Sequence, residues 1–321
     1  MPFVVAMGVA VVAAALLSGC GGGDSTGDSF AGGDPTADLF AYESDRPLDA
    51  EVVAQPAYAG DEIEEVTYAG ADDARVPGFL GFPPSQGPRP CVIYLHGFGR
   101  SNEDAAGLVG PLAGQGIGLL AIDAPSHGAR SQGAAELERL IDDPRRLAAM
   151  LEQTVIDLRR GLDLLESRRE CDPDRLGFIG FSFGAATGAM LAGVDGRVHS
   201  SVLLSGGAGW KRVLRRLDMT YSDGSRATPI DASGFGALAP YAVDRWVSRI
   251  APRPVLIVNG RDDEVIPAAA AEALHRAAGK GSTLLWHDGG HDPFAGPQAS
   301  RVAQAVDDFL RRTLVAGGQA G

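Results

Sequence analysis

The residues best suited to chemistry lie in the segment RLGFIGFSFGAATG, at positions 175–188. An apolar run leads there to Ser182, with Gly180 and Gly184 two positions away on either side, which is the pattern G-x-S-x-G. This pattern is typical of a serine at the apex of a sharp strand-to-helix turn, where small flanking residues let the backbone pass closely. Such a serine is placed for nucleophilic attack. Taken alone, the pattern also fits a buried strand that meets a turn of small residues, because the chain holds 44 glycines.

A nucleophilic serine needs a base that accepts its proton and a third group that orients the base. The segment RDDEVIP follows the apolar run PVLIVNG, and GGHDPF follows STLLWHD. His291 comes directly after two glycines, which free the loop to bring the imidazole to Ser182, so the sequence favours His291 as the base. Asp262 and Asp263 are adjacent, and residue type and spacing alone do not separate them as the orienting acid.

Acyl transfer also needs two backbone N–H donors that face the developing oxyanion. The amide of Phe183 directly follows the nucleophile at the start of a predicted helix, and the loop HGFG after the run CVIYLHG offers the amide of Phe98. We expect His96 to hold this loop by hydrogen bonds. Asp123 and His127, in IDAPSHGARS, are predicted to shape a neighbouring loop; a second catalytic pair or a metal site is the less favoured reading.

The composition limits the classes of partner. The chain has 321 residues, of which 45% are hydrophobic and 21% charged, and this suits one larger α/β domain or two small ones. A net charge of −13 argues against a nucleic-acid partner and makes anionic polymers poor candidate substrates. No zinc-ligand spacing, dinucleotide fingerprint or phosphate loop is present in the sequence, so no metal and no cofactor is predicted.

The amino terminus begins with MPFVVAMGVAVVAAALLSGC, an uncharged apolar run of signal-peptide length that ends in small residues. Residues 17–20 resemble the lipobox of bacterial lipoproteins, in which the cysteine is lipidated and becomes the first residue of the mature protein. The basic residue usual near Met1 is missing. We predict a signal peptide over 1–19 and an exported protein that is lipid-anchored at the bacterial cell envelope through Cys20. A plain secreted protein and an uncleaved anchor are the alternatives.

The content of Gly, Asp, Pro and Ser predicts a flexible tether over residues 20–57. The strands and helices that position the candidate catalytic residues follow this tether. In the predicted folded domain, residues 58–321, two alternating segments, EIEEVTYAG and RVPGFLGFP, indicate an antiparallel pair of strands. Short apolar runs separated by helical spacing then predict buried parallel strands. A long crossover helix is expected after Asp143 as its cap and Pro144 in its first turn.

The segment from about residue 208 to residue 250 does not follow the alternation of strand runs and helices. It lies between the sixth and the seventh predicted strands. A loop this long in a compact domain is usually functional. We therefore predict a small cap over the site, with an ordinary surface insertion as the alternative. Its aromatic residues are candidate substrate contacts: Trp210, Tyr221, Phe235, Tyr241 or Trp246.

Export would permit disulfide bonds, and two cysteines remain after Cys20. Cys91 opens the run CVIYLHG, and Cys171 precedes the run RLGFIG. If these two runs are neighbouring parallel strands, both cysteines lie near the same end of the sheet. The sequence therefore suggests a disulfide between Cys91 and Cys171, with two buried thiols as the alternative.

From about Glu62 to Leu314 the chain resembles the α/β hydrolase superfamily, and within it the dienelactone hydrolase and acetyl esterase-like group related to prolyl oligopeptidase catalytic domains. The matching landmarks, in family order, are YLHGFGRS, IDAPSHGARS, GFIGFSFG, APRPVLIVNGRDDEVIP and WHDGGHDPF. The resemblance implies a mostly parallel, doubly wound sheet flanked by helices. The family pattern G-x-x-D-x-x-[VI]-P falls on Gly260, Asp263, Ile266 and Pro267, and this assigns the orienting acid to Asp263.

The resemblance implies a serine esterase that cleaves small-molecule carboxylic esters through an acyl-enzyme, with Ser182, His291 and Asp263 as the triad. Dienelactone hydrolases proper use a cysteine nucleophile, so the serine here argues against their substrate. A peptidase or amidase of the prolyl oligopeptidase type is the alternative among enzymes. A non-catalytic surface binding lipoprotein is the alternative from another class.

Overall fold

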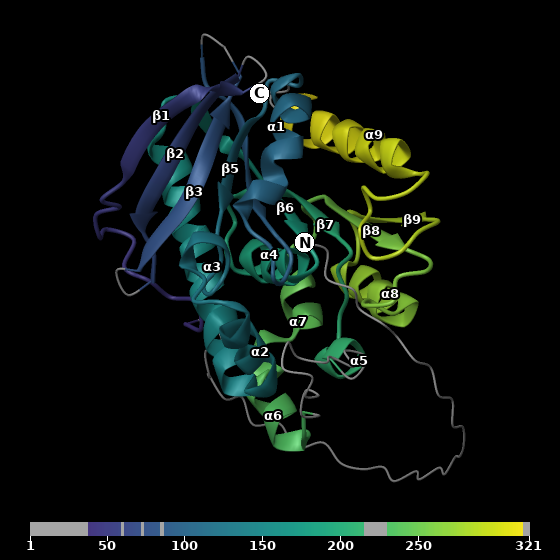
Figure 1. Ribbon diagram of the computed structural model, residues 1–321. Helices are drawn as coiled ribbons and strands as arrows, with labels where there is room; N and C mark the ends of the chain where they lie inside the picture. The colour runs from purple at the N-terminus through teal and green to yellow at the C-terminus, as the bar shows by residue number, and fades with distance from the viewer. Residues whose placement is uncertain (1–37, 59–60, 72–73, 84–86, 215–229, 317–321) are drawn as a thin grey trace, which may run out of the picture.

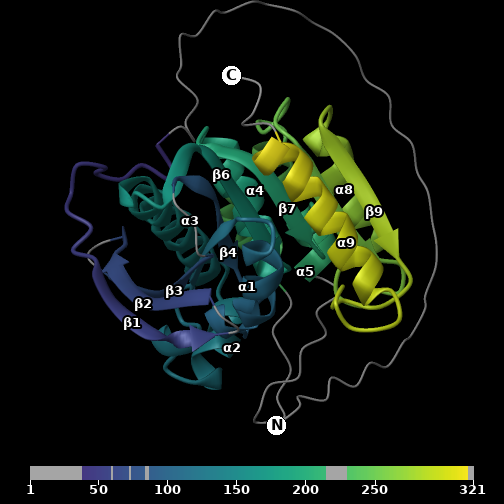
Figure 2. The ribbon, with the colours of Figure 1, turned by 90° about the horizontal axis from the view of Figure 1, so that it is seen from above.

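The computed structural model describes residues 38–316, apart from 59–60, 72–73, 84–86 and 215–229. Its strands form one sheet in the order β1-β2-β3-β5-β4-β6-β7-β8-β9. The pairs from β1 to β5 are antiparallel, and every pair from β5 through β4 to β9 is parallel. The predicted α/β-hydrolase fold, a mostly parallel sheet flanked by helices, is confirmed (Figures 1 and 2).

The strands are β1 (Glu51–Tyr58), β2 (Asp61–Ala69), β3 (Arg75–Phe82), β4 (Arg89–Leu95), β5 (Gly118–Ile122), β6 (Cys171–Phe181), β7 (Val198–Leu204), β8 (Val255–Gly260) and β9 (Ser282–His287). The α-helices are α1 (Ala106–Ala113), α2 (Ala134–Asp142), α3 (Pro144–Ser167), α4 (Phe183–Val194), α5 (Trp210–Leu214), α6 (Ala232–Ala237), α7 (Val243–Val247), α8 (Ala268–Ala278) and α9 (Ala299–Leu310). Short helical turns are η2 (Asn102–Ala105), η3 (Gly128–Arg130), η4 (Ala239–Tyr241) and η5 (Arg311–Val315).

The central strands β4, β5 and β8 are buried at every position, which explains why they are continuous apolar runs rather than alternating ones. Two hydrophobic clusters cover the two faces of the sheet. One contains residues of α3, α4 and α8, and the other contains residues of α1 and α9. The long crossover helix α3 begins as predicted, with the carboxylate of Asp143 accepting from the amides of Arg145 and Arg146 and with Pro144 in the first turn.

The insertion predicted as a cap lies between β7 and β8, one strand later in the count because β1 precedes the predicted set. Its described helices α5, α6 and α7 gather with α2 at the lower end of the molecule in Figure 1. Tyr241 and Trp246 are not exposed to substrate, since their side chains are buried in the core beneath these helices. The prediction that these two residues are candidate substrate contacts is therefore wrong, because their rings pack under the insertion. Tyr221 lies outside the described residues.

The predicted tether over 20–57 is too long, because the chain joins the folded domain well before residue 58. The Phe40 ring is fully buried, with its centroid 5.0 Å from that of Trp246, and the Tyr42 hydroxyl donates to Asp163 at 2.8 Å. Residues 51–58 form β1, which pairs antiparallel with β2 at the edge of the sheet. Val52 and Val53 of this edge strand both remain exposed, so its residues do not alternate between buried and exposed. The sequence therefore lacks the alternating pattern by which a strand is predicted. The predicted signal peptide and Cys20 lie outside the described residues.

The structure pairs Cys91 with Cys171 in a disulfide that joins the amino ends of β4 and β6, with 5.7 Å between the two Cα atoms. The bond closes a loop of 80 residues that includes α1, β5, α2 and α3. Among the described residues, no helix is long and apolar enough to span a bilayer.

Replacing both cysteines by alanine is expected to lower the free energy of unfolding by about 2 to 5 kcal/mol, because a closed loop restricts the unfolded chain. Urea unfolding of the oxidised protein and of the Cys91→Ala/Cys171→Ala variant would measure the difference. Treatment of the wild-type protein with a reductant should reproduce most of the loss. Equal midpoints for the oxidised protein and the variant would contradict the prediction.

Candidate active site

Ser182 lies at the turn between β6 and α4 with φ 54° and ψ −106°, a strained conformation for a residue with a side chain. A Cβ atom at Gly180 would overlap the carbonyl of Gly184, and one at Gly184 would overlap the carbonyl of Leu95 at the end of β4. Both glycines of the sequence pattern are therefore needed for the close approach of α4 to the sheet. The amide of Ser182 donates to the carbonyl of Leu204 in β7 at 2.8 Å, which fixes the turn.

The structure brings the three residues predicted as a triad into hydrogen-bond contact. His291 Nε2 lies 2.8 Å from Ser182 Oγ, and His291 Nδ1 lies 2.9 Å from Asp263 Oδ2. Asp263 is almost fully buried, and its Oδ1 also accepts from the amides of Val265 and Ile266 at 2.8 Å each. An ionised carboxylate only accepts, so Nδ1 of His291 carries the proton and Nε2 is left to accept from the serine hydroxyl. This is the tautomer that a general base requires.

Asp262, the other candidate acid, is exposed and does not contact His291. The preceding residue, Arg261, lies 3.5 Å from Asp288. Adjacent residues in this turn point in different directions, and only Asp263 turns inward between the ends of β8 and β9.

The candidate oxyanion donors, Phe98 and Phe183, lie together beside Ser182, with their ring centroids 6.2 Å apart. Their backbone amides donate to no acceptor that the structure describes. The loop of Phe98 is drawn to the start of α4 by a hydrogen bond from the amide of Gly184 to the carbonyl of His96 at 3.1 Å. Within the described residues, two N–H donors are thus left without an acceptor, one directly after Ser182 and one in the loop held to the start of α4.

His96 holds the loop of Phe98 as predicted from the sequence. Its Nδ1 lies 2.8 Å from the carbonyl of Gly97, and its Nε2 accepts from the amide of Ala124 at 3.1 Å. Asp123 supports the same region from the end of β5, because its carboxylate accepts from the amides of Asn102 and Ala129. These contacts give both residues a role in shaping the loops at the carboxyl edge of the sheet.

His127 is buried among these loops rather than exposed in a second catalytic pair. Its ring stacks on that of Phe183 with an interplanar angle of 11°, and it meets the Phe98 ring edge-on at a centroid distance of 5.1 Å. Nδ1 of His127 lies 2.7 Å from the carbonyl of Pro125, which marks Nδ1 as the protonated nitrogen. The neutral imidazole thus fills the space beneath both candidate oxyanion donors.

Ser205 is a site residue that the sequence analysis missed. It follows β7 with φ 52°, and its Oγ donates to the main-chain carbonyl of His291 at 2.6 Å. This bond connects the loop of His291 to the end of β7, the strand that pairs with β6 before Ser182. The only signal in the sequence is its place directly after an apolar strand, in the short segment SGG.

Acidification is expected to destabilise the protein through two buried histidines. Burial lowers the pKa of His96 to about 4 and that of His127 to about 4. Because these folded-state values lie below the unfolded value of about 6.5, the stabilisation is complete above pH 6.5 and is lost as the pH falls toward 4. The loss between pH 7.5 and 5 is about 2 kcal/mol for each histidine.

Urea unfolding at several pH values, for the wild-type protein and the His127→Asn variant, would measure this dependence. Removal of one titrating ring should make the pH slope shallower. A slope that is identical in both proteins would contradict the assignment of the acid sensitivity to His127.

No cluster of His, Cys, Asp and Glu suited to a metal ion occurs within the ranges that the structure covers. The arrangement of Ser182, His291 and Asp263 with two unused amides is suited to nucleophilic acyl transfer.

Two family models match the chain. The alpha/beta hydrolase family matches residues 92–249, and the TAP-like protein family matches residues 239–318. Among curated proteins, the chain is 28% identical over 265 residues to the uncharacterized protein YfhR of Salmonella typhi, covering 79% of this chain and 84% of that protein. It is also 28% identical over 207 residues to the esterase YjfP of Escherichia coli, covering 64% of this chain and 81% of that protein.

Solved structures share the fold at low sequence identity. Acetyl xylan esterase 1 from Thermoanaerobacterium superposes with a TM-score of 0.69 at 20% identity, covering 87% of this chain and 91% of that chain. An acetyl xylan esterase from Paenibacillus superposes with a TM-score of 0.70 at 21% identity, covering 87% of this chain and 92% of that chain. The two family matches together span residues 92–318, which contain Ser182, Asp263 and His291. From its family matches and its fold, the chain belongs to the α/β hydrolase superfamily.

Proposed function

We propose that this hydrolase is a serine esterase that cleaves carboxylic esters through an acyl-enzyme. The observation that carries the proposal is the continuous hydrogen-bond chain from Ser182 Oγ through His291 to the buried Asp263, with distances of 2.8 and 2.9 Å. The esterase YjfP among the relatives, and the acetyl xylan esterases among the structures of the same fold, support the choice of esters.

In the first half of the proposed reaction, Ser182 Oγ attacks the ester carbonyl carbon while its proton passes to His291 Nε2. The carbonyl oxygen becomes an oxyanion that accepts from the amides of Phe98 and Phe183. Asp263 keeps the ring oriented and stabilises the imidazolium. The tetrahedral intermediate then collapses, the carbon–oxygen bond to the alcohol breaks, and His291 gives its proton to the leaving alkoxide.

In the second half, water takes the place of the alcohol. It loses a proton to His291 Nε2 as its oxygen attacks the acyl carbon, and the bond to Ser182 Oγ breaks with return of that proton. The acid product leaves, and the free enzyme is regenerated. Every step uses groups of this chain and water alone.

Hydrolysis of 4-nitrophenyl esters from acetate to long acyl chains tests the proposal, together with the matched anilides and with labelling by a fluorophosphonate. We expect ester turnover and labelling at Ser182. Turnover of anilides at rates similar to those of the esters would favour an amidase. Absence of both turnover and labelling would overturn the proposal and favour a binding lipoprotein.

We also propose that the protein is exported and anchored through a lipid on Cys20, on the strength of the apolar run before it and the lipobox-like residues 17–20. Growth of the expressing bacterium with an alkyne-tagged fatty acid should label the wild-type protein and not the Cys20→Ser variant. Labelling that is equal in both would contradict the anchor.

A further inference from the structure

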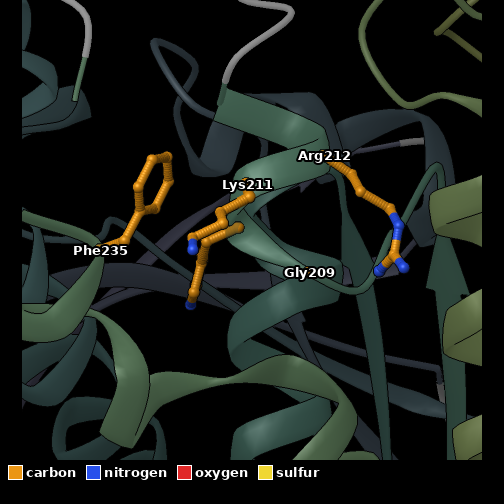
Figure 3. Close-up of a pocket in the computed structure, with 5 residues that line it drawn as sticks. Gly209, Lys211, Arg212 and Phe235 are labelled. Atoms are coloured by element: carbon orange, nitrogen blue, oxygen red, sulfur yellow. The ribbon is translucent and has the colours of Figure 1, made fainter. Parts of the chain in front are cut away.

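A hollow of about 420 Å³ opens on the insertion that follows β7, and Figure 3 shows the side chains around it. Its lining combines aromatic rings and cations from a short segment after the loop of Ser205 and from α6. The lining residues are Gly209, Trp210, Lys211, Arg212 and Phe235. None of them has a part in the acyl-transfer chemistry proposed above.

The aromatic part of this hollow is held in place by the fold. The indole Nε1 of Trp210 donates to the carbonyl of Tyr241 at 3.0 Å. Tyr241 is itself buried, and its hydroxyl donates to Glu152 on α3 at 2.5 Å. Phe235 stands on α6 and faces the ammonium of Lys211, which lies 5.6 Å from the ring centroid. The hollow therefore offers a fixed apolar wall with a cation at its edge.

The two cations of the hollow are exposed and have no carboxylate partner among the residues that the structure describes. Several arginines of the described part of the chain are paired with carboxylates; for example, Arg130 lies 2.7 Å from Asp157. Figure 3 shows Lys211 and Arg212 leaving α5 in different directions, with Lys211 on the side of Phe235. Within the described residues, the hollow thus carries two positive charges without a carboxylate partner, in a chain with a net charge of −13.

Negative charges lie on the loop that follows β8, at the same edge of the sheet. Asp262 and Glu264, which follow β8, are exposed, and within the described ranges neither one pairs with a cation. Fields of exposed charges decay within about 8 to 10 Å in physiological salt, so these local charges matter more to a ligand at the site than the net charge. An anionic group is repelled by the loop after β8 and attracted to α5.

The hollow lies on the segment that continues from β7, the strand whose last residue accepts from the amide of Ser182. The amide of Ser182 bonds to the carbonyl of Leu204, and Gly209 follows only five residues later. Five extended residues span at most about 18 Å. Gly206, between them, packs against Ala185 in the first turn of α4, which keeps the segment close to the nucleophile.

We propose that this hollow binds the carboxylate of the substrate, so that the preferred esters carry a negative charge beyond an apolar body. Lys211 and Arg212 attract the carboxylate, and Trp210 and Phe235 contact the apolar part. The inference rests on the proposed esterase function, and it names a class of acidic esters as the substrates of that site.

Matched pairs of esters test the inference. Mono-4-nitrophenyl adipate carries a carboxylate, and 4-nitrophenyl methyl adipate has the same length without the charge. A second pair, 3-acetoxybenzoate and methyl 3-acetoxybenzoate, places the charge on the alcohol side. We expect kcat/KM to be roughly tenfold higher for the acid in at least one pair, through a lower KM, because two exposed ion pairs each contribute modestly.

The Lys211→Gln/Arg212→Gln variant should bring the two members of the pair to nearly equal kcat/KM, because kcat/KM falls for the acid far more than for the neutral ester. High salt should have the same effect on the wild-type protein. Lys280→Gln, the same change at an exposed lysine after α8, is the matched control and should keep the preference.

Equal rates for both members of both pairs in the wild-type protein would overturn the inference, and so would a preference that survives in the double variant. In either case hydrolysis of the neutral esters would leave the esterase proposal intact. If neither member of any pair is hydrolysed, the proposed function fails first, and the inference fails with it.

Discussion

Replacing Ser182 by alanine is expected to lower kcat for ester hydrolysis by roughly 10³ or more, because the members of a triad act as a unit and no other group can form the acyl-enzyme. The variant should fold, since alanine keeps the backbone of the turn and removes only the hydroxyl that contacts His291. Stopped-flow or steady-state assays would measure the loss. A short-chain nitrophenyl ester serves as substrate, and the absorbance of the released nitrophenolate is followed.

The matched control for this variant is Ser248→Ala, which removes an exposed hydroxyl whose only described partner is the carbonyl of Arg245. It should keep the wild-type rate. Turnover by the Ser182→Ala variant within tenfold of the wild type, with a normal thermal melt, would exclude Ser182 as the nucleophile.

The second large effect is expected at Asp263, and its neighbour provides the comparison. Asp263→Asn should lower kcat by about 10⁴, because an amide in place of the carboxylate no longer holds the base in its productive tautomer. Asp262→Asn removes the same charge one residue away, at an exposed position without contact to His291. We expect it to change kcat by less than about threefold.

Steady-state kinetics of both variants, with circular dichroism to establish folding, would measure this difference. An asparagine at 263 also faces the amides of Val265 and Ile266 with a group that donates as well as accepts, so some loss of stability is expected. Equal activities of the two variants would show that the buried carboxylate does not orient the base.

The prediction that Tyr241 and Trp246 are candidate substrate contacts was wrong for a physical reason. Aromatic residues in an insertion are candidates for substrate contact only if they remain exposed, and exposure is a property of packing. Trp246 and Tyr241 enclose Phe40, a residue about 200 positions earlier that the composition assigned to a tether. No local pattern links these positions, because the contact forms only when the chain has folded.

The sequence by itself determined the class of the fold and the identity of the residues brought together at the candidate site. Strand runs that are buried on both sides must be apolar throughout, and a close approach at Ser182 demands glycine on both sides, so these requirements are visible in residue types. Asp143 and Pro144 likewise marked the start of α3, because helix capping depends on a few neighbouring residues.

Only the tertiary structure decided contacts between distant segments. It placed Ser205 against the carbonyl of His291, and it buried His127 under Phe98 and Phe183. It also gathered Trp210, Lys211 and Phe235 around one hollow. Such contacts depend on how side chains from several helices and strands are oriented toward one another. No local sequence pattern records this orientation, because it arises only when distant segments pack together.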